Sequence, residues 1–255
     1  MTQNGPGEAI RAILIFGAAR TINILLVVIR AKLIASLLGP AGIGLLGLLS
    51  AVQEVGAQTS DAGASHAAVR QIAREADAPD RMRALRAALM WLAIAGGLTG
   101  AAVLFALRSQ IADLLLGDTT QQDAFGILAV GLFLLVIFRW QQSLLSGYRR
   151  ARSLAVMVVL ATALGTLAGA AAVWSLGTDG LVWAVVAMPA AGVCVALFFT
   201  RKLPRPVVSG SSLRTALTGV LRLGPGLMAI ALLALLSPLA VRVWLTWDIG
   251  LDAAG

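Results

Sequence analysis

Residues 153–176 read SLAVMVVLATALGTLAGAAAVWSL and residues 180–200 read GLVWAVVAMPAAGVCVALFFT, with only Gly177-Thr178-Asp179 between them. Neither stretch contains a charged residue. A helix that rises about 1.5 Å per residue needs about 20 apolar residues to cross the ~30 Å hydrocarbon core of a bilayer, and both stretches have that length. Because so short a connection cannot hold a domain, this part of the sequence predicts a transmembrane helical hairpin.

The same composition continues along the rest of the chain. Its 255 residues are 59% hydrophobic and 13% charged, whereas a soluble domain has about 25% charged residues. Residues 87–107 and 223–241 are also free of charge, and residues 10–38, 41–68 and 125–145 are apolar stretches that contain a few charged side chains. We therefore predict an all-α fold, a polytopic membrane helix bundle of about seven transmembrane helices.

The expected helices divide into two unequal parts. Residues 1–200 are predicted to form an N-terminal six-helix transmembrane lobe, and residues 201–222 a cytoplasmic linker with an amphipathic helix. Residues 223–255 then hold the first helix of a second lobe. Within the first lobe, the first helix is predicted to end at Gly39-Pro40, and the second to run without a break over residues 41–75.

The distribution of basic residues predicts the orientation in the membrane. The chain carries a formal charge of +8, which in a soluble protein would favour nucleic acid as a partner. Here the arginines gather on alternate loops, which the positive-inside rule places in the cytoplasm together with the N-terminus. We therefore expect membrane lipids and no nucleic acid as partners. The arginines of these loops are Arg70, Arg74, Arg81, Arg83, Arg86, Arg149, Arg150, Arg152, Arg201, Arg205, Arg214 and Arg222.

Signatures of enzymes and of cofactor sites are scarce. Neither Lys32 nor Lys202 follows a glycine-rich run or precedes Ser or Thr, so a phosphate-binding loop is not expected. His66 is the only histidine, and its place at a cytoplasmic helix end favours a surface residue over a member of a Ser-His-Asp triad. The lone Cys194 cannot form a disulfide or a zinc site by itself. We predict a protein that is not an enzyme and has no catalytic residue, cofactor or metal site.

A polar stripe runs along one of the apolar helices. Ser50, Glu54, Gln58, Asp61 and Ser65 recur at intervals of three or four residues, which places them on one helical face. An ionised side chain that faces lipid costs about 2.5 to 3.5 kcal/mol on insertion scales. We therefore expect this polar stripe to face water, another protein segment or a cargo.

Two other helices present polar faces of the same kind. Arg20, Asn23 and Arg30 lie within about a quarter turn of one another on the first helix, given about 3.6 residues per turn. Arg139 and Gln142 share a face of the fourth helix with Ser143 and Ser146. Intramembrane residues of this kind line a cavity, a water path or an ion pair.

The charged residues permit three interpretations. Arg20 or Arg30 pairs with Glu54 or Asp61 and locks two helices together. Alternatively, Arg30 extends to the outer interface of the membrane. For Arg20 and Arg139 the sequence favours a cavity, because both lie well inside apolar stretches. Guanidinium groups bind phosphate bidentately and keep their charge, so a cationic cavity suits an anionic cargo.

Four short motifs carry a resemblance to a known family. They are Arg30-Ala31-Lys32, Leu38-Gly39-Pro40-Ala41-Gly42-Ile43-Gly44-Leu45, Val69-Arg70-Gln71-Ile72-Ala73 and Gly147-Tyr148-Arg149-Arg150. In these motifs the chain resembles the N-terminal part of Wzx-type O-antigen and polysaccharide flippases. These are polysaccharide biosynthesis proteins of the multidrug/oligosaccharidyl-lipid/polysaccharide exporter superfamily.

The resemblance implies the N-terminal lobe of a two-lobe flippase in the bacterial inner membrane. Such a protein moves a lipid-diphosphate-linked oligosaccharide, an O-antigen or related polysaccharide repeat unit, from the cytoplasmic to the periplasmic leaflet by alternating access. Its partners include polysaccharide polymerase and chain-length machinery. Because family members have a complete second lobe, we expect a truncated product. The substrate-binding residues expected from the polar faces and the resemblance are Arg20, Asn23, Arg30, Glu54, Gln58, Asp61, Arg139 and Gln142.

Other functions stay open at this point. Glu54 and Asp61 suit the proton or sodium site of a cation-coupled multidrug exporter. A membrane glycosyltransferase or polysaccharide polymerase would use a carboxylate as base, although the longest outer loop, residues 108–123, is short for an acceptor site. The last alternative is a non-transporting fragment that needs a partner lobe.

Overall fold

A computed structural model describes residues 6–61, 63–74, 79–117, 121–201, 203 and 218 of the chain. The regular structure of these residues is entirely helical, as the sequence predicts. Its elements are α1 (Pro6–Asp61), α2 (Ala64–Arg74), α3 (Pro79–Ala106), α4 (Arg108–Leu116), α5 (Gln122–Gly147), α6 (Ala151–Leu176), the 3-10 helix η1 (Gly177–Asp179) and α7 (Gly180–Thr200). The short helix α4 lies in what the sequence predicts as an outer loop.

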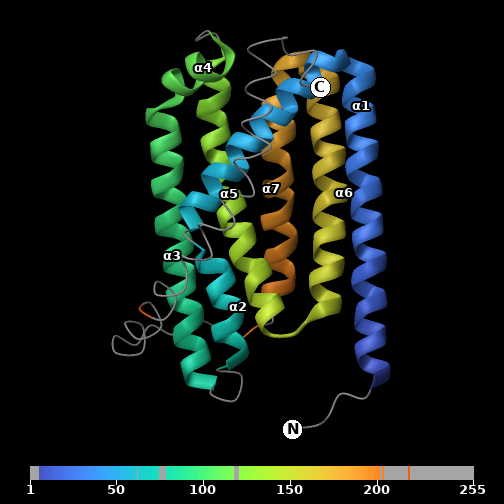
Figure 1. The fold of residues 1–255 in the computed structure, drawn as a ribbon, viewed down its shortest axis with the longest axis vertical. Coiled ribbons are helices and arrows are strands. Elements are labelled where there is room, and N and C mark those ends of the chain that lie inside the picture. Colours follow the sequence, from blue (N-terminus) through green and yellow to red (C-terminus); the bar gives the residue numbers. More distant parts are fainter. Residues whose placement is uncertain are drawn as a thin grey trace.

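The long helices stand side by side in a bundle. Figure 1 shows α3, α5, α7, α6 and the first half of α1 in that order across the view, and each packs against the next. The second half of α1 crosses this row and contacts α5 and α3. The C-terminal ends of α5 and α7 lie at the same end of the bundle as the N-terminal ends of α3 and α6 (Figure 1). This topology brings Arg149, Arg150, Arg152 and Arg201 to one end of the bundle, whereas Arg205, Arg214 and Arg222 lie outside the described residues.

The chain reverses direction within α1, at Gly39. This residue has φ 70° and ψ −168°, a conformation that glycine alone adopts readily because it has no Cβ. Pro40 follows and has no backbone N–H to donate to the first half of the helix. Residues 6–38 and 40–61 therefore form two separate helical segments, which we call the first arm and the second arm of α1 (Figure 1). The helix end that the sequence predicts at Gly39-Pro40 lies between them.

A second break interrupts the helix that the sequence predicts over residues 41–75. α1 ends at Asp61, Gly63 has φ 72°, and α2 begins at Ala64, so the prediction of one continuous helix is wrong. The side chain of Asp61 provides an acceptor for a backbone N–H group in the first turn of α2, which has no partner within the helix. Its carboxylate accepts hydrogen bonds from the backbone N–H of Ser65 at 3.1 Å and from the Ser65 hydroxyl at 2.6 Å.

The helices identify a multi-pass membrane protein. Among the described residues, the stretches long and apolar enough to cross a membrane are Gly17–Asp61, Met82–Ala106, Gln122–Gly147 and Ala151–Thr200. The first and last have 45 and 50 residues and contain the reversals at Gly39 and at η1, so each is long enough for two crossings. The count of about seven helices is not confirmed. The predicted last helix lies outside the described residues, as does most of the predicted linker.

Glycines allow several helices to approach closely. A Cβ at Gly165 of α6 would lie 2.9 Å from Cα of Met188 in α7, and one at Gly169 would lie 3.1 Å from Cα of Ala184. Gly96 and Gly100 of α3 face Ser60 of α1 in the same way. These contacts use small residues as membrane bundles commonly do.

Candidate functional site

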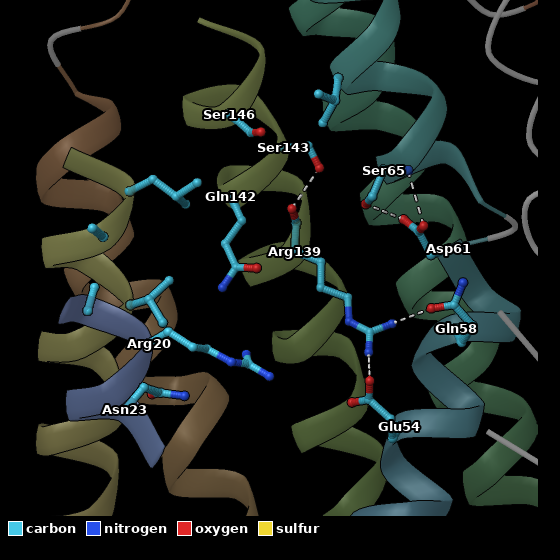
Figure 2. Close-up of a pocket in the computed structure, with 15 residues that line it drawn as sticks. Arg20, Asn23, Glu54, Gln58, Asp61, Ser65, Arg139, Gln142, Ser143 and Ser146 are labelled. Carbon is cyan, nitrogen blue, oxygen red and sulfur yellow. Dashed lines mark hydrogen bonds and ion pairs between the residues drawn. The ribbon is translucent and has the colours of Figure 1, made fainter. Parts of the chain in front are cut away.

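A pocket of about 540 Å³ separates the two arms of α1. The first arm and α6 lie on one side, and the second arm, α2 and α5 lie on the other (Figure 2). Of the residues predicted to bind substrate, all except Arg30 line this pocket. Its lining residues are Ala19, Arg20, Asn23, Glu54, Gln58, Asp61, Ser65, Val69, Arg139, Gln142, Ser143, Ser146, Leu154, Ala155 and Val158.

An ion pair closes one wall of the pocket. The guanidinium of Arg139 on α5 donates to Oε1 of Glu54 through Nη2 and to Oε1 of Gln58 through Nη1, the latter at 3.0 Å (Figure 2). The polar stripe therefore meets the α5 polar face, formed by Arg139, Gln142, Ser143 and Ser146. The sequence allows an ion pair of Arg20 or Arg30 with a carboxylate of the stripe, but the structure joins Glu54 to Arg139 instead.

Arg20 is the cation that this arrangement leaves without an anion. Its side chain extends from the first arm of α1 into the pocket (Figure 2), and it is exposed. Among the described residues, none forms a hydrogen bond or an ion pair with it. The two carboxylates of the lining are already engaged, since Glu54 pairs with Arg139 and Asp61 caps α2. The pocket therefore offers a ligand one guanidinium that has no partner among the described residues.

Asn23 holds the first arm of α1 in place. The hydroxyl of Thr162 on α6 donates to Oδ1 of Asn23 at 2.6 Å, and Thr162 is buried. Arg20 lies one helical turn before Asn23, so this hydrogen bond fixes the position from which the guanidinium extends. Asn23 has a positioning role as well as a place in the lining.

Arg30 lies outside the pocket lining. Its Nη2 donates to the backbone carbonyl of Ala184 in α7 at 3.0 Å, which ties the first arm of α1 to α7. Arg30 and Arg20 share a face of the first arm of α1, as the sequence predicts. However, ten residues of helix separate the two by about 15 Å along the axis, which is enough to carry Arg30 past the pocket. Its expected role in substrate binding therefore has no support from its position.

One wall of the pocket had no signal in the sequence. Leu154, Ala155 and Val158 of α6 line it with apolar atoms only. They belong to a charge-free stretch in which nothing distinguishes a pocket-facing side from a lipid-facing side. The other lining residues beyond the expected set include Ser65 of the polar stripe and Ser143 and Ser146 of the α5 polar face, which the sequence does reveal, together with Ala19 and Val69.

A second pocket, of about 300 Å³, lies at the opposite end of α5. It is lined by the start of α5, by η1 and by the second arm of α1 near Leu45. The charged members of its lining are Asp123 and Asp179, both carboxylates. In the described part of the chain, the two ends of the bundle thus present pockets of different charge.

The family of the chain follows from its sequence as a whole. A model of the polysaccharide biosynthesis protein family matches residues 33–245. The chain belongs to the polysaccharide biosynthesis protein family. The family resemblance carried by the motifs is thereby confirmed. No curated protein matches this polysaccharide biosynthesis protein.

Solved structures show the fold of this polysaccharide biosynthesis protein to be that of MOP superfamily transporters. One is a MOP superfamily transporter from Pyrococcus furiosus, described by the reverse polarity of its binding pocket. It has a TM-score of 0.65 and 17% identity over 92% of this chain and 53% of its own. The other is a multidrug resistance MATE family transporter in an outward-facing conformation, with a TM-score of 0.66 and 17% identity over 93% of this chain and 54% of its own. The chain thus spans about half the length of these transporters.

Proposed function

We propose that this protein translocates a lipid-diphosphate-linked oligosaccharide, an O-antigen or related polysaccharide repeat unit. Movement runs from the cytoplasmic to the periplasmic leaflet of a bacterial inner membrane by alternating access, with the N-terminus in the cytoplasm. The observation that carries the proposal is that the guanidinium of Arg20 has no partner among the described residues and extends into a polar pocket inside an apolar bundle. The family membership and the transporter fold support it.

The chemistry of the pocket fits a diphosphate headgroup. A guanidinium in a partly dehydrated site gains most from an anion that accepts two parallel hydrogen bonds, and phosphate does so. Gln142 and Ser146, also in the lining, add hydrogen-bonding groups for sugar hydroxyls. The apolar wall of α6 provides a surface for the lipid chain next to the headgroup.

The charges along the bundle favour movement in one direction. Arginines gather at the end with the Arg20 pocket, whereas the pocket at the opposite end contains Asp123 and Asp179. An anion that reaches this second pocket meets repulsion and is released. An inside-negative membrane potential adds about 2.3 kcal/mol per charge per 100 mV for outward movement of a negative headgroup.

Binding of a diphosphate lipid to Arg20 variants tests the proposal. The chain is reconstituted in nanodiscs and titrated with farnesyl diphosphate, a short isoprenyl diphosphate. Loss of a charged hydrogen bond costs about 1.5 to 3 kcal/mol, so Arg20→Gln should weaken binding about 10- to 100-fold. Lys32→Gln is the matched control, because Lys32 is an exposed cation on the same arm but outside the pocket lining. Equal affinities of the wild type and Arg20→Gln would contradict the proposal.

A cation-coupled multidrug exporter is the second candidate. The likeness to a MATE family transporter and the two carboxylates in the pocket favour it. The engagement of both carboxylates within the protein argues for the first candidate, because a coupling ion would have to displace Arg139 or the α2 N-terminus. Drug export that is lost in Glu54→Gln and in Asp61→Asn but kept in Arg20→Gln would reverse this order.

A further inference from the structure

The turn between α5 and α6 contains an unusual arginine. Arg149 has φ 53°, and it is the only residue other than glycine with positive φ in the described part of the chain. A Cβ makes this left-handed conformation unfavourable, so Gly or Asn is the usual residue there. Arg149 is nevertheless held in it by a tight turn, in which its N–H donates to the Ser146 carbonyl and the Arg150 N–H donates to the Leu145 carbonyl, both at 3.0 Å. Strained residues of this kind cluster at active sites and at segments that hold ligands.

The backbone of this turn joins two segments that line the Arg20 pocket, and we call the turn the rim of that pocket. Arg149 is hydrogen-bonded to Ser146, and the carbonyl of Arg150 accepts from the N–H of Leu154 at 3.0 Å. Ser146 and Leu154 both line the pocket. Arg149 and Arg150 therefore lie directly between two segments of the pocket wall, and both side chains are exposed.

A polar path leads from this rim into the pocket. Ser146, Gln142 and Arg139 succeed one another along α5, and all line the pocket. The seven steps of helix between Arg139 and Ser146 cover about 10 Å. The side chains of Arg149 and Arg150 form no ion pair with any described residue, so their charges are available to a ligand at the start of the path.

We propose that Arg149 and Arg150 form an entrance site that captures the diphosphate of the lipid-linked cargo before it reaches Arg20. This inference rests on the proposed function. The continuity of the two arginines with the pocket wall favours the cargo headgroup over the surrounding anionic phospholipid, which would meet arginines equally well away from the rim. Local positive charge of this kind raises association rates by electrostatic steering and changes dissociation little.

Association kinetics of farnesyl diphosphate with the chain in phosphatidylcholine nanodiscs provide the test. Arg149→Gly removes the charge and relieves the backbone, because glycine adopts φ 53° without cost. Arg149→Lys keeps the charge, and Arg150→Gln removes the neighbouring one. Arg152→Gln is the matched control, because Arg152 is exposed but lies in the first turn of α6, outside the turn that joins the two lining segments.

We expect association to be about 3- to 10-fold slower in Arg149→Gly and in Arg150→Gln, and unchanged within about 2-fold in Arg149→Lys and Arg152→Gln. The difference should disappear at about 1 M salt, where screening extends to about 3 Å. Wild-type association rates in both Arg149→Gly and Arg150→Gln would overturn the entrance site and leave the proposed function intact. A wild-type chain that does not bind farnesyl diphosphate would overturn the proposed function itself.

A further measurement distinguishes binding of the cargo from binding of bulk lipid. The same variants are compared in nanodiscs that contain phosphatidylglycerol, and the phospholipid retained by each variant is measured. The entrance site predicts equal retention by all variants. Reduced retention in Arg149→Gly together with unchanged farnesyl diphosphate kinetics would overturn the proposal and assign the two arginines to bulk anionic lipid.

Discussion

Arg139 on α5 forms an ion pair with Glu54 on the second arm of α1, across 85 positions of sequence. The side chain of Arg139 is 17% exposed and that of Glu54 is 42% exposed, so the pair lies at the edge of the pocket rather than in the core. Because Gln58 accepts from the same guanidinium, two successive turns of α1 are attached to one residue of α5. This relationship determines which arginine of the pocket stays free for a ligand.

The Glu54–Arg139 pair should contribute measurably to stability. In a double-mutant cycle with Glu54→Gln and Arg139→Gln, we expect a coupling of about 1 kcal/mol, at the upper end for exposed pairs because Arg139 is mostly buried. Thermal unfolding of the single and double variants in detergent gives this value. A coupling near zero would show that the pair has no net stabilising effect.

Asp61 should stabilise the start of α2. Replacement of a capping residue by alanine costs about 0.5 to 2 kcal/mol, so Asp61→Ala should increase hydrogen exchange in the first turn of α2. Asp61→Asn is the matched variant, because its amide oxygen can still accept from the Ser65 N–H. It should show a smaller increase, and equal exchange in the two variants would contradict the capping role.

The contact of α3 with Ser60 should tolerate no added methyl group. A Cβ at Gly100 collides with the Ser60 side chain, and one at Gly96 collides with the Ser60 carbonyl. Gly96→Ala and Gly100→Ala should each cost about 1 to 3 kcal/mol, measured by chemical unfolding. Ser60→Ala should partly rescue Gly100→Ala but not Gly96→Ala, since it removes the hydroxyl and keeps the backbone.

A control for this series is available on α5. A Cβ at Gly126 would lie 3.6 Å from the Phe105 ring, an ordinary contact, and alanine is the better helix former by up to about 1 kcal/mol. Gly126→Ala should therefore leave stability unchanged or raise it. Destabilisation similar to that of Gly100→Ala would mean that the effect is not specific to Ser60.

Tyr148 should ionise at unusually high pH. Burial raises the pKa of its phenol, and the nearby charges of Arg86 and Arg150 lower it by less. Tyr148 is the only tyrosine, so a tyrosinate absorbance titration reports on this residue alone. The midpoint should lie above the reference value of about 10 in the folded protein and near it in denaturant. Arg150→Gln should raise the midpoint further.

The raised pKa of Tyr148 should make the folded protein less stable at high pH. The folded state holds the phenol proton more tightly than the unfolded state does, so stability is unaffected below pH about 10 and falls as the pH rises from there through the folded pKa. Unfolding measured across this pH range should show the loss, and Tyr148→Phe should not. A folded-state midpoint at or below the denatured one would contradict the burial of the phenol.

Local periodicity explains how much of the site the sequence revealed. Helical spacing alone placed Glu54, Gln58 and Asp61 on one face and Arg139 and Gln142 on another, and all of them line one pocket. Spacing did not reveal the break at Gly63, because a single glycine is tolerated within many helices and its conformation depends on what surrounds it. The apolar wall formed by α6 gave no signal for a different reason, because its residue types are those of any lipid-facing helix.

Neighbouring residues are enough to predict an all-helical membrane protein whose polar faces must avoid lipid, because hydrophobic length and helical period are local properties of the chain. Which of those faces meet depends on how the helices pack. Glu54 could have paired with Arg20, Arg30 or Arg139, and the crossing of the second arm of α1 over α5 selected Arg139. The same packing directed Arg30 to the Ala184 carbonyl and left Arg20 free in the pocket. The distance between two helices depends on the contacts of the whole bundle, which no local pattern encodes.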